Sequence, residues 1–269
     1  MNLRLYSLIK IYLIYLIYFL FFSQKKNFFK FIINNKKLSR SQIFQDLFAC
    51  FFCNYKKKGT FIEIGGGNGV DLSNTYILEK KFKWNGVICE PDNRLHDNIL
   101  SKRKCFLETK PVSNYSNKKI YFYFKGLYDS YGSSVYNASA KELKSISLNN
   151  LIKKYQLGKD IDYISIDTEG SELDIIKNFN FNKHNVKIFT IEHNFNKNIR
   201  KNIYKIFKKN NYERIFKYIS YMDDWYIKKI IINLIKRLNN SNGLSFCKRL
   251  QILQHLSVEY FIILFGYIT

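Results

Sequence analysis

The stretch Phe61-Ile62-Glu63-Ile64-Gly65-Gly66-Gly67-Asn68-Gly69 indicates the fold of this chain. A short apolar run ends in a cluster of glycines, and residues 72–82 follow with a helix-like pattern. A glycine turn after a strand lets the backbone approach a nucleotide closely, because no Cβ stands in the way. The helix that follows offers its N-terminal N–H groups to the same ligand. The stretch therefore predicts an α/β sheet that binds a nucleotide-like cofactor.

A second apolar run, Gly86 to Cys89, ends at an acid, Glu90. At about this distance from a glycine turn, an acid at the tip of the second strand accepts hydrogen bonds from ribose hydroxyls. The dinucleotide pattern G-x-G-x-x-G/A fails, because Val70 stands where the third glycine belongs. The alternative without a ligand is a plain glycine-rich turn.

The spacing that fits is Glu63-x-Gly65-x-Gly67-x-Gly69. This acid-led pattern resembles the first motif of class I S-adenosylmethionine-dependent methyltransferases. S-adenosylmethionine has no pyrophosphate, but its amino-acid end needs a carboxylate and backbone groups. The expected cofactor is therefore S-adenosyl-L-methionine.

Acidic residues also follow two later predicted strands. Asp167-Thr168-Glu169-Gly170-Ser171-Glu172 comes after the run from Ile161, and Glu192-His193 follows the run from Val186 to Ile191. Ligands of open α/β sheets bind at the carboxyl edge of the strands, so these groups are expected to face the same crevice as the glycines. Titratable groups that converge beside a cofactor loop predict an active site.

Taken together, these motifs resemble the FkbM family of S-adenosylmethionine-dependent methyltransferases. The Asp-x-Glu-Gly-x-Glu piece at Asp167 is its most diagnostic part, and the resemblance runs from about Ser41 to Ile227. The other matching pieces are Ser41–Asp46, Phe61–Gly65, Ser73–Glu79, Trp84–Pro91, Ile191–Asn194 and Asp223–Trp225. The resemblance implies a Rossmann-like class I methyltransferase fold, with a mostly parallel seven-stranded sheet and helices on both faces. It also implies O-methylation of a hydroxyl on a sugar, a glycan or a related metabolite.

The expected site has two halves. The cofactor half contains Glu63, Gly65, Gly67, Gly69, Glu90 and Ser113. The catalytic half contains Asp167, Glu169 and His193, with either Asp167 or His193 as the general base and Glu169 orienting the substrate or the base. The alternative for Glu169 and Glu172 is that each only caps the next helix.

The same acids also suggest a metal site as an alternative. Asp167, Glu169 and His193 together could hold Mg²⁺, but spacing shows no full ligand set, so no metal is expected. The acceptor pocket is expected between a loop at residues 128–138 and the turn Asp223-Asp224-Trp225, where Trp225 would stack on a sugar ring. The acceptor is a small molecule or a glycan.

The amino-acid composition limits which partners and which cellular compartment are expected. The net charge of +23 would suit a polyanion, but the overused residues are those of A/T-rich codons and the lysines are scattered. No nucleic-acid partner is therefore expected. The five cysteines form no even disulfide framework, and Cys50-x-x-Cys53 is interpreted as two ordinary buried thiols, which favours a cytoplasmic catalytic domain.

The chain is divided into residues 1–37, 38–229 and 230–269. The first segment contains the apolar run Leu5 to Phe22, which is either a membrane anchor or an apolar extension packed on the protein. With an anchor, the positive flanks would keep the domain at 38–229 in the cytoplasm. Residues 230–269 are expected to form a helical extension. Two other functions stay open: a nicotinamide-dependent oxidoreductase, and a non-catalytic membrane-tethered protein that kept the fold.

Overall fold

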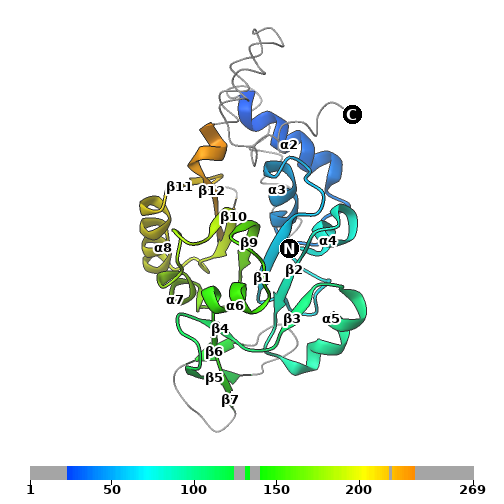
Figure 1. Cartoon of the computed structure of the whole chain (residues 1–269). Coiled ribbons are helices and arrows are strands. Elements are labelled where there is room, and N and C mark those ends of the chain that lie inside the picture. The colour runs from blue at the N-terminus through cyan, green and yellow to red at the C-terminus, as the bar shows by residue number, and fades with distance from the viewer. Residues whose placement is uncertain (1–22, 124–130, 134–139, 218–219, 234–269) are drawn as a thin grey trace.

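The computed structural model describes residues 23–123, 131–133, 140–217 and 220–233. Its centre is a seven-stranded sheet in the order β11-β12-β10-β9-β1-β2-β3 (Figure 1). The strands of this sheet are β1 (Thr60–Ile64), β2 (Asn85–Cys89), β3 (Phe106–Glu108), β9 (Asp160–Ile166), β10 (Asn185–Glu192), β11 (Tyr212–Ile215) and β12 (Asp223–Lys228). Strands β3, β2, β1, β9 and β10 are parallel, and β12 joins them antiparallel with β11 at its outer side. This is the mostly parallel sheet of a Rossmann-like class I methyltransferase fold.

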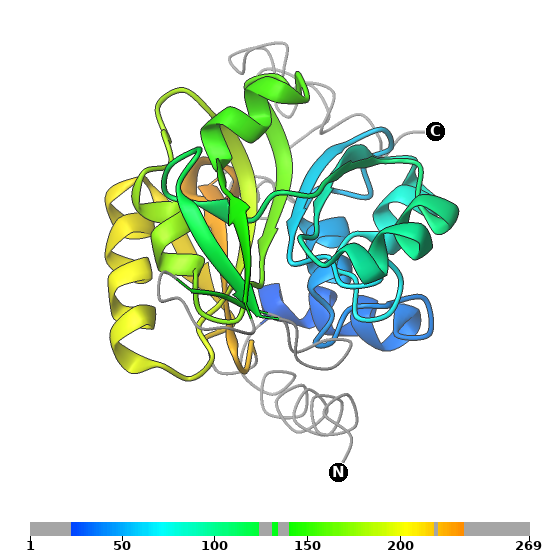
Figure 2. The same cartoon turned by 90° about the horizontal axis from the view of Figure 1, so that it is seen from below.

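Helices cover both faces of this sheet (Figures 1 and 2). Consecutive strand residues point to opposite faces, so Phe61 joins one hydrophobic core and Ile62 the other. The first core packs under α2 (Ser23–Asn35), α3 (Gln45–Phe52), α4 (Tyr76–Phe82) and α5 (His96–Lys102). The second packs under α6 (Leu148–Lys154), α7 (Glu172–Lys177) and α8 (Lys197–Lys209). Burial on both faces explains why β1 and β9 carry apolar side chains on both sides of the sheet.

Strand β1 lies between β2 and β9, so the order of the strands reverses at this point of the sheet. Such a switch point opens a crevice at the carboxyl ends of the strands. The glycine loop leaves β1 here, beside the end of β9. Gly65 has a φ of 83°, and a Cβ on it would lie 1.6 Å from the carbonyl oxygen of Asp167. The two halves of the predicted site therefore meet through backbone contact that only glycine permits.

Smaller strands stand at the carboxyl edge. Strand β5 (Lys119–Tyr123) pairs antiparallel with β6 (Tyr131–Ser133) and β7 (Lys141–Lys144), and β4 (Val112–Ser113) pairs with β8 (Ile146–Ser147). The sequence predicted β5 but expected only a loop at residues 128–138, where β6 forms. The rest of that loop lies outside the described residues. The 3-10 turn η1 (Asn93–Leu95) precedes α5.

Several local predictions need correction. The helix expected from residue 72 begins at Tyr76, because residues 73–75 are bound by the carboxylate of Glu63 instead of entering a helix. The prediction that Trp225 stacks on a sugar ring is wrong. Trp225 is 1% exposed, and its ring centroid lies 4.6 Å from that of Phe48. Its strand position places it on the buried face, which the turn-like sequence Asp223-Asp224 did not reveal. The prediction of buried thiols is confirmed for Cys50 and Cys53, which are free and buried.

The apolar run Leu5 to Phe22 and residues 234–269 lie outside the described residues. Across the described ranges, no helix has both the length and the apolar character needed to cross a bilayer.

Candidate active site

A cavity of about 350 Å³ opens at the carboxyl ends of β1 and β9. This volume is within the usual range for small-molecule sites. The backbone of the glycine loop and Glu90 line one side, and acids that follow β9 and β10 line the other. Ile120 and Phe122 of β5 add an apolar wall. The two motifs that the sequence predicted to converge therefore share one cavity.

Glu90 lies at the tip of β2 and lines this cavity, as the sequence predicted. Its Oε2 accepts a hydrogen bond of 2.8 Å from the Gly67 N–H, and its Oε1 accepts one of 2.9 Å from Asp92 N–H. Burial raises the pKa of the Glu90 carboxyl to about 7. The carboxylate therefore ties the glycine loop to the second strand while remaining at the cavity wall. Gly65 and Gly67 also line the cavity.

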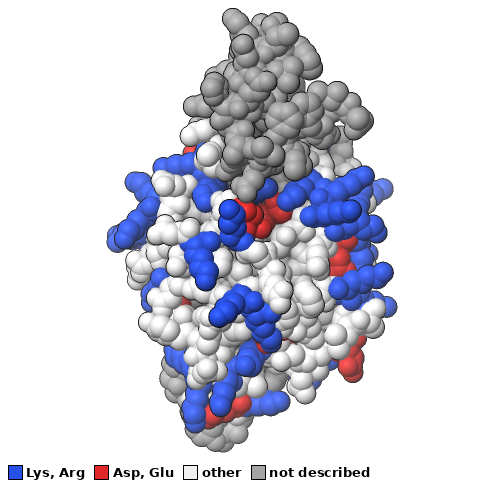
Figure 3. Space-filling model, viewed as in Figure 1, with Lys and Arg blue, Asp and Glu red and all other residues white. Residues whose placement is uncertain are grey.

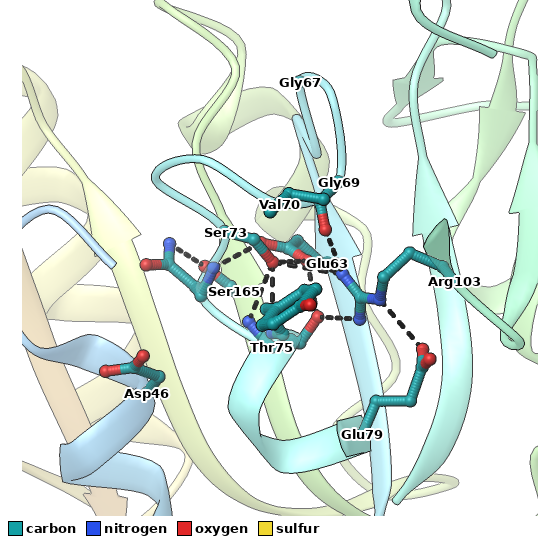
Figure 4. A network of polar contacts seen from close by, with 12 residues as sticks. Asp46, Glu63, Gly67, Gly69, Val70, Ser73, Thr75, Glu79, Arg103 and Ser165 are labelled. Carbon is teal, nitrogen blue, oxygen red and sulfur yellow. Dashed lines mark hydrogen bonds and ion pairs between the residues drawn. The ribbon is translucent and has the colours of Figure 1, made fainter. Parts of the chain in front are cut away.

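Glu63 does not line the cavity, although the sequence placed it among the cofactor ligands. Figure 4 shows its side chain beneath the loop. Its carboxylate accepts hydrogen bonds from Ser73 Oγ at 2.9 Å, Asn74 N–H at 2.5 Å and Thr75 Oγ1 at 2.5 Å. Burial raises its pKa, and the charge of Arg103, 3.8 Å away, opposes that shift. Glu63 therefore shapes the loop that follows β1 from below.

Arg103 completes this network from the end of α5. Its side chain is fully buried and donates to Glu79 Oε2 at 2.9 Å, Thr75 Oγ1 at 2.9 Å and the Gly69 carbonyl at 2.7 Å (Figure 4). The carbonyl of Gly69 therefore binds Arg103, and Gly69 does not line the cavity. Sequence reasoning missed Arg103, because no spacing rule connects it with a loop more than thirty residues earlier.

Asn74 is a cavity residue that the sequence reasoning did not single out, although it lies in one of the pieces matched above. Its Nδ2 donates to Ser165 Oγ on β9 at 2.8 Å. Its Oδ1 is buried and has no hydrogen-bond partner within the described part of the chain. A buried amide oxygen without a donor is costly, so a donor from a ligand would stabilise it.

The acidic half of the cavity is formed by Asp167, Glu169 and Glu192. One carboxylate oxygen from each lies within 4.8 Å of the others. Burial and mutual repulsion raise the pKa of both Asp167 and Glu192, so this pair retains a proton near neutral pH. Sequence reasoning expected Glu192 among the converging groups but named only Asp167, Glu169 and His193 as catalytic; at the end of β10, Glu192 lines the cavity and His193 does not.

The loop that carries Glu169 is braced. Glu172 Oε1 accepts from Thr168 N–H at 2.9 Å, Thr168 Oγ1 at 2.9 Å and Gly170 N–H at 3.0 Å. Glu169 has a left-handed φ of 57°, and Asn194 Nδ2 donates to its Oε2 at 2.9 Å. Glu172 thus stabilises the loop that precedes α7, while Glu169 lines the cavity.

His193 lies away from this cluster. It is buried but does not line the cavity. Its Nδ1 accepts from the Phe195 N–H at 3.1 Å, and its Nε2 lies 4.0 Å from Asp224 Oδ1. Because side chains alternate along an extended chain, Glu192 and the next residue point to opposite faces. Burial lowers the pKa of His193, which therefore remains neutral beside α8.

Two further residues complete the cavity wall. Ser113 of β4 lines it, as the sequence expected, and donates from Oγ to Asn114 Oδ1 at 3.2 Å. Gln45 at the start of α3 also lines it and donates from Nε2 to Asp223 Oδ2 at 2.9 Å. Asp223 is the cross-strand neighbour of Glu192, so Gln45 supports the wall on which Glu192 stands.

A family model described as the methyltransferase FkbM domain matches residues 63–222. Among solved structures, precorrin-6y C5,15-methyltransferase from Geobacter metallireducens is similar at 10% identity and a TM-score of 0.38, covering 71% of this chain and 90% of that one. A TM-score this low supports no inference about chemistry. The search of curated proteins finds no match.

Proposed function

Because the chain belongs to the FkbM methyltransferase family, we propose that it transfers a methyl group from S-adenosylmethionine to a hydroxyl oxygen. The acceptor we propose is a sugar, a glycan or a related metabolite. One observation carries this proposal: a single cavity joins the glycine loop and Glu90 to a cluster of three acids. The first half suits a nucleoside cofactor, and the second suits the proton chemistry that a hydroxyl acceptor requires.

The residues present fit S-adenosylmethionine. The carboxylate of Glu90 at the tip of β2 is placed to accept from ribose hydroxyls. The buried Asn74 Oδ1 needs a donor, and the α-ammonium of the cofactor is one. Leu95, Pro111 and Val112 supply apolar surface for a purine ring. The loop of Gly65, Gly66 and Gly67 brings bare backbone to the same space.

The bound cofactor supplies an electrophilic methyl group on a sulfonium. The cavity residues align the acceptor oxygen with that methyl, which is the larger part of the task in such a displacement. Transfer of that methyl would form a C–O bond and break the C–S bond, with the electron pair kept by sulfur, and a cavity carboxylate would accept the hydroxyl proton. We assign that carboxylate to Asp167 or Glu192, which both line the cavity; burial raises the pKa of Asp167 to about 7 and that of Glu192 to about 10. His193 does not line the cavity, so we do not assign it this role.

Two experiments test this proposal. Calorimetry of the full chain with S-adenosylmethionine and with NAD should show binding of the first alone, since Val70 breaks the dinucleotide pattern. Binding of NAD alone would favour an oxidoreductase instead. Labelled S-adenosylmethionine with a glycan panel, followed by mass spectrometry, should then identify which hydroxyl gains a methyl. A non-catalytic protein would transfer none, and Asp167→Ala would be silent.

We also propose that no nucleic acid is a partner, because Lys and Arg are spread over the visible face in separate groups (Figure 3). Membrane association through the segment Leu5 to Phe22 remains a proposal, as does a cytoplasmic catalytic domain. Flotation of the full chain with lipid vesicles in a density gradient tests the association. Recovery of the protein only in the bottom fraction, apart from the vesicles, contradicts it.

A further inference from the structure

The acidic half of the cavity holds three carboxylates close together, and their negative charge must be balanced by a positive one. Carboxylate oxygens of Asp167, Glu169 and Glu192 lie within 4.8 Å of one another, on the ends of two neighbouring strands. Like charges this close repel strongly when water is largely excluded. A stable arrangement therefore requires a proton or a cation between them.

Among the described residues, no basic side chain pairs with the two acids Asp167 and Glu192. The sequence has 44 Lys and Arg against 21 Asp and Glu, so cations are abundant. Buried acids elsewhere do use them: Asp162 binds Lys56 and Lys187, and Glu79 binds Arg103. Within the described ranges, neither Asp167 nor Glu192 makes an ion pair with Lys or Arg.

A second observation points to a ligand at this place. Glu192 is 4% exposed, and its Oε2 has no hydrogen-bond partner among the described residues. Yet Glu192 lines the cavity, alongside Asp167 and Glu169. A buried carboxylate oxygen is normally bound by donors or by a metal ion. Here the unsatisfied oxygen belongs to the same three residues that converge.

The surrounding contacts hold this cluster in position. Glu172 braces the loop at Thr168 and Gly170, and Asn194 Nδ2 orients the Glu169 carboxylate. Such fixed carboxylates resemble a prepared ligand set more than flexible surface acids. The cavity of about 350 Å³ that these acids line has room for water or for an oxygen of the acceptor.

From this geometry we infer that Asp167, Glu169 and Glu192 bind one divalent, oxygen-preferring cation such as Mg²⁺ or Mn²⁺. Three carboxylates and no nitrogen or sulfur donor are the ligands such ions prefer. This set replaces the one weighed from the sequence, because Glu192 and not His193 reaches the cavity. It deepens the proposed methyl transfer: a cation there would coordinate the acceptor oxygen and make its hydroxyl more acidic.

Mn²⁺ binding to the full chain tests the site without relying on activity. After EDTA treatment and desalting, Mn²⁺ is titrated while the free-ion signal is followed by electron paramagnetic resonance, and Mg²⁺ is then added as a competitor. We expect about one Mn²⁺ per chain, displaced by Mg²⁺. Glu192→Gln and Glu169→Gln should each weaken binding at least about tenfold, because each removes one charged ligand. Glu169 is exposed, so its variant should fold even if the buried Glu192→Gln does not.

Asp174→Asn is the matched control, since Asp174 is an exposed acid of α7 that pairs only locally with Lys177. It should leave Mn²⁺ binding unchanged. Absence of Mn²⁺ binding, or equal binding by the Glu169→Gln chain and the wild type, overturns the inference and leaves a shared proton as the counterpart. S-adenosylmethionine binding by the EDTA-treated chain is measured in parallel. If it persists while Mn²⁺ does not bind, only the cation site fails and the methyltransferase proposal stands.

Discussion

Replacing Arg103 by Met should destabilise the fold more than any exposed charge change, because Arg103 neutralises acids beneath the glycine loop. The guanidinium is fully buried, 2.9 Å from Glu79 and 3.8 Å from Glu63, both of which are also buried. Met keeps much of the side-chain volume but removes every donor. Two buried carboxylates and the Gly69 carbonyl then lose their cation.

The magnitude follows from those contacts. Removing one partner of a buried ion pair costs about 3–5 kcal/mol, because the remaining charge stays desolvated. For a domain of this size, about 4 kcal/mol lowers the melting temperature by roughly 10 °C. Adding Glu63→Gln should recover part of the loss, since it removes one of the stranded charges. The loop would also lose its brace, so S-adenosylmethionine should bind more weakly.

Urea unfolding of the full chain, followed by tryptophan fluorescence, measures this change. Lys177→Met is the matched control, because it breaks an exposed pair with Asp174 and should cost less than about 1 kcal/mol. If Arg103→Met loses no more stability than Lys177→Met, the buried network does not support the loop and the reasoning is refuted.

Three further predictions concern the cavity. Gly65→Ala should cost more than about 3 kcal/mol, because its Cβ would overlap the Asp167 carbonyl; Gly158→Ala, with a similar φ of 79° but no atom within 4 Å, should cost only about 1–2 kcal/mol by thermal unfolding. Equal losses would contradict the backbone contact. Burial raises the pKa of the Glu90 carboxyl to about 7, so its protonated form stabilises the folded state. This stabilisation is complete below the pKa of the unfolded chain and is lost as the pH rises through about 7. Between about pH 5 and pH 8 the cofactor-free wild type should therefore lose about 1–3 kcal/mol more than Glu90→Gln, and parallel stability curves would exclude the effect. His193→Asn should keep the methyl-transfer rate within about threefold, because the ring does not line the cavity; a loss above about a hundredfold would restore His193 as the base.

The sequence predicted the parts of the site that depend on local order along the chain. A strand that ends in glycines, and acids at the ends of later strands, lie on one edge whenever the strands are parallel. Gly65, Gly67, Glu90, Asp167 and Glu169 therefore line the cavity, as spacing indicated. Spacing could not show which way a side chain turns at the end of a strand. Glu192 and His193 are consecutive in the chain, and the alternation between them decides which side chain faces the cavity.

Taken alone, the sequence determined the fold class and predicted the kind of cofactor, because periodicity and glycine spacing are local properties that survive in any parallel sheet. Tertiary structure alone decided that Glu63 and Gly69 support the loop through Arg103, which reaches them from the end of α5. It alone decided that Trp225 is buried among aromatic rings. It also brought Glu192 within 4.8 Å of Asp167 and Glu169. The reason is physical: such contacts join residues far apart in the chain, and packing of the whole sheet determines their geometry.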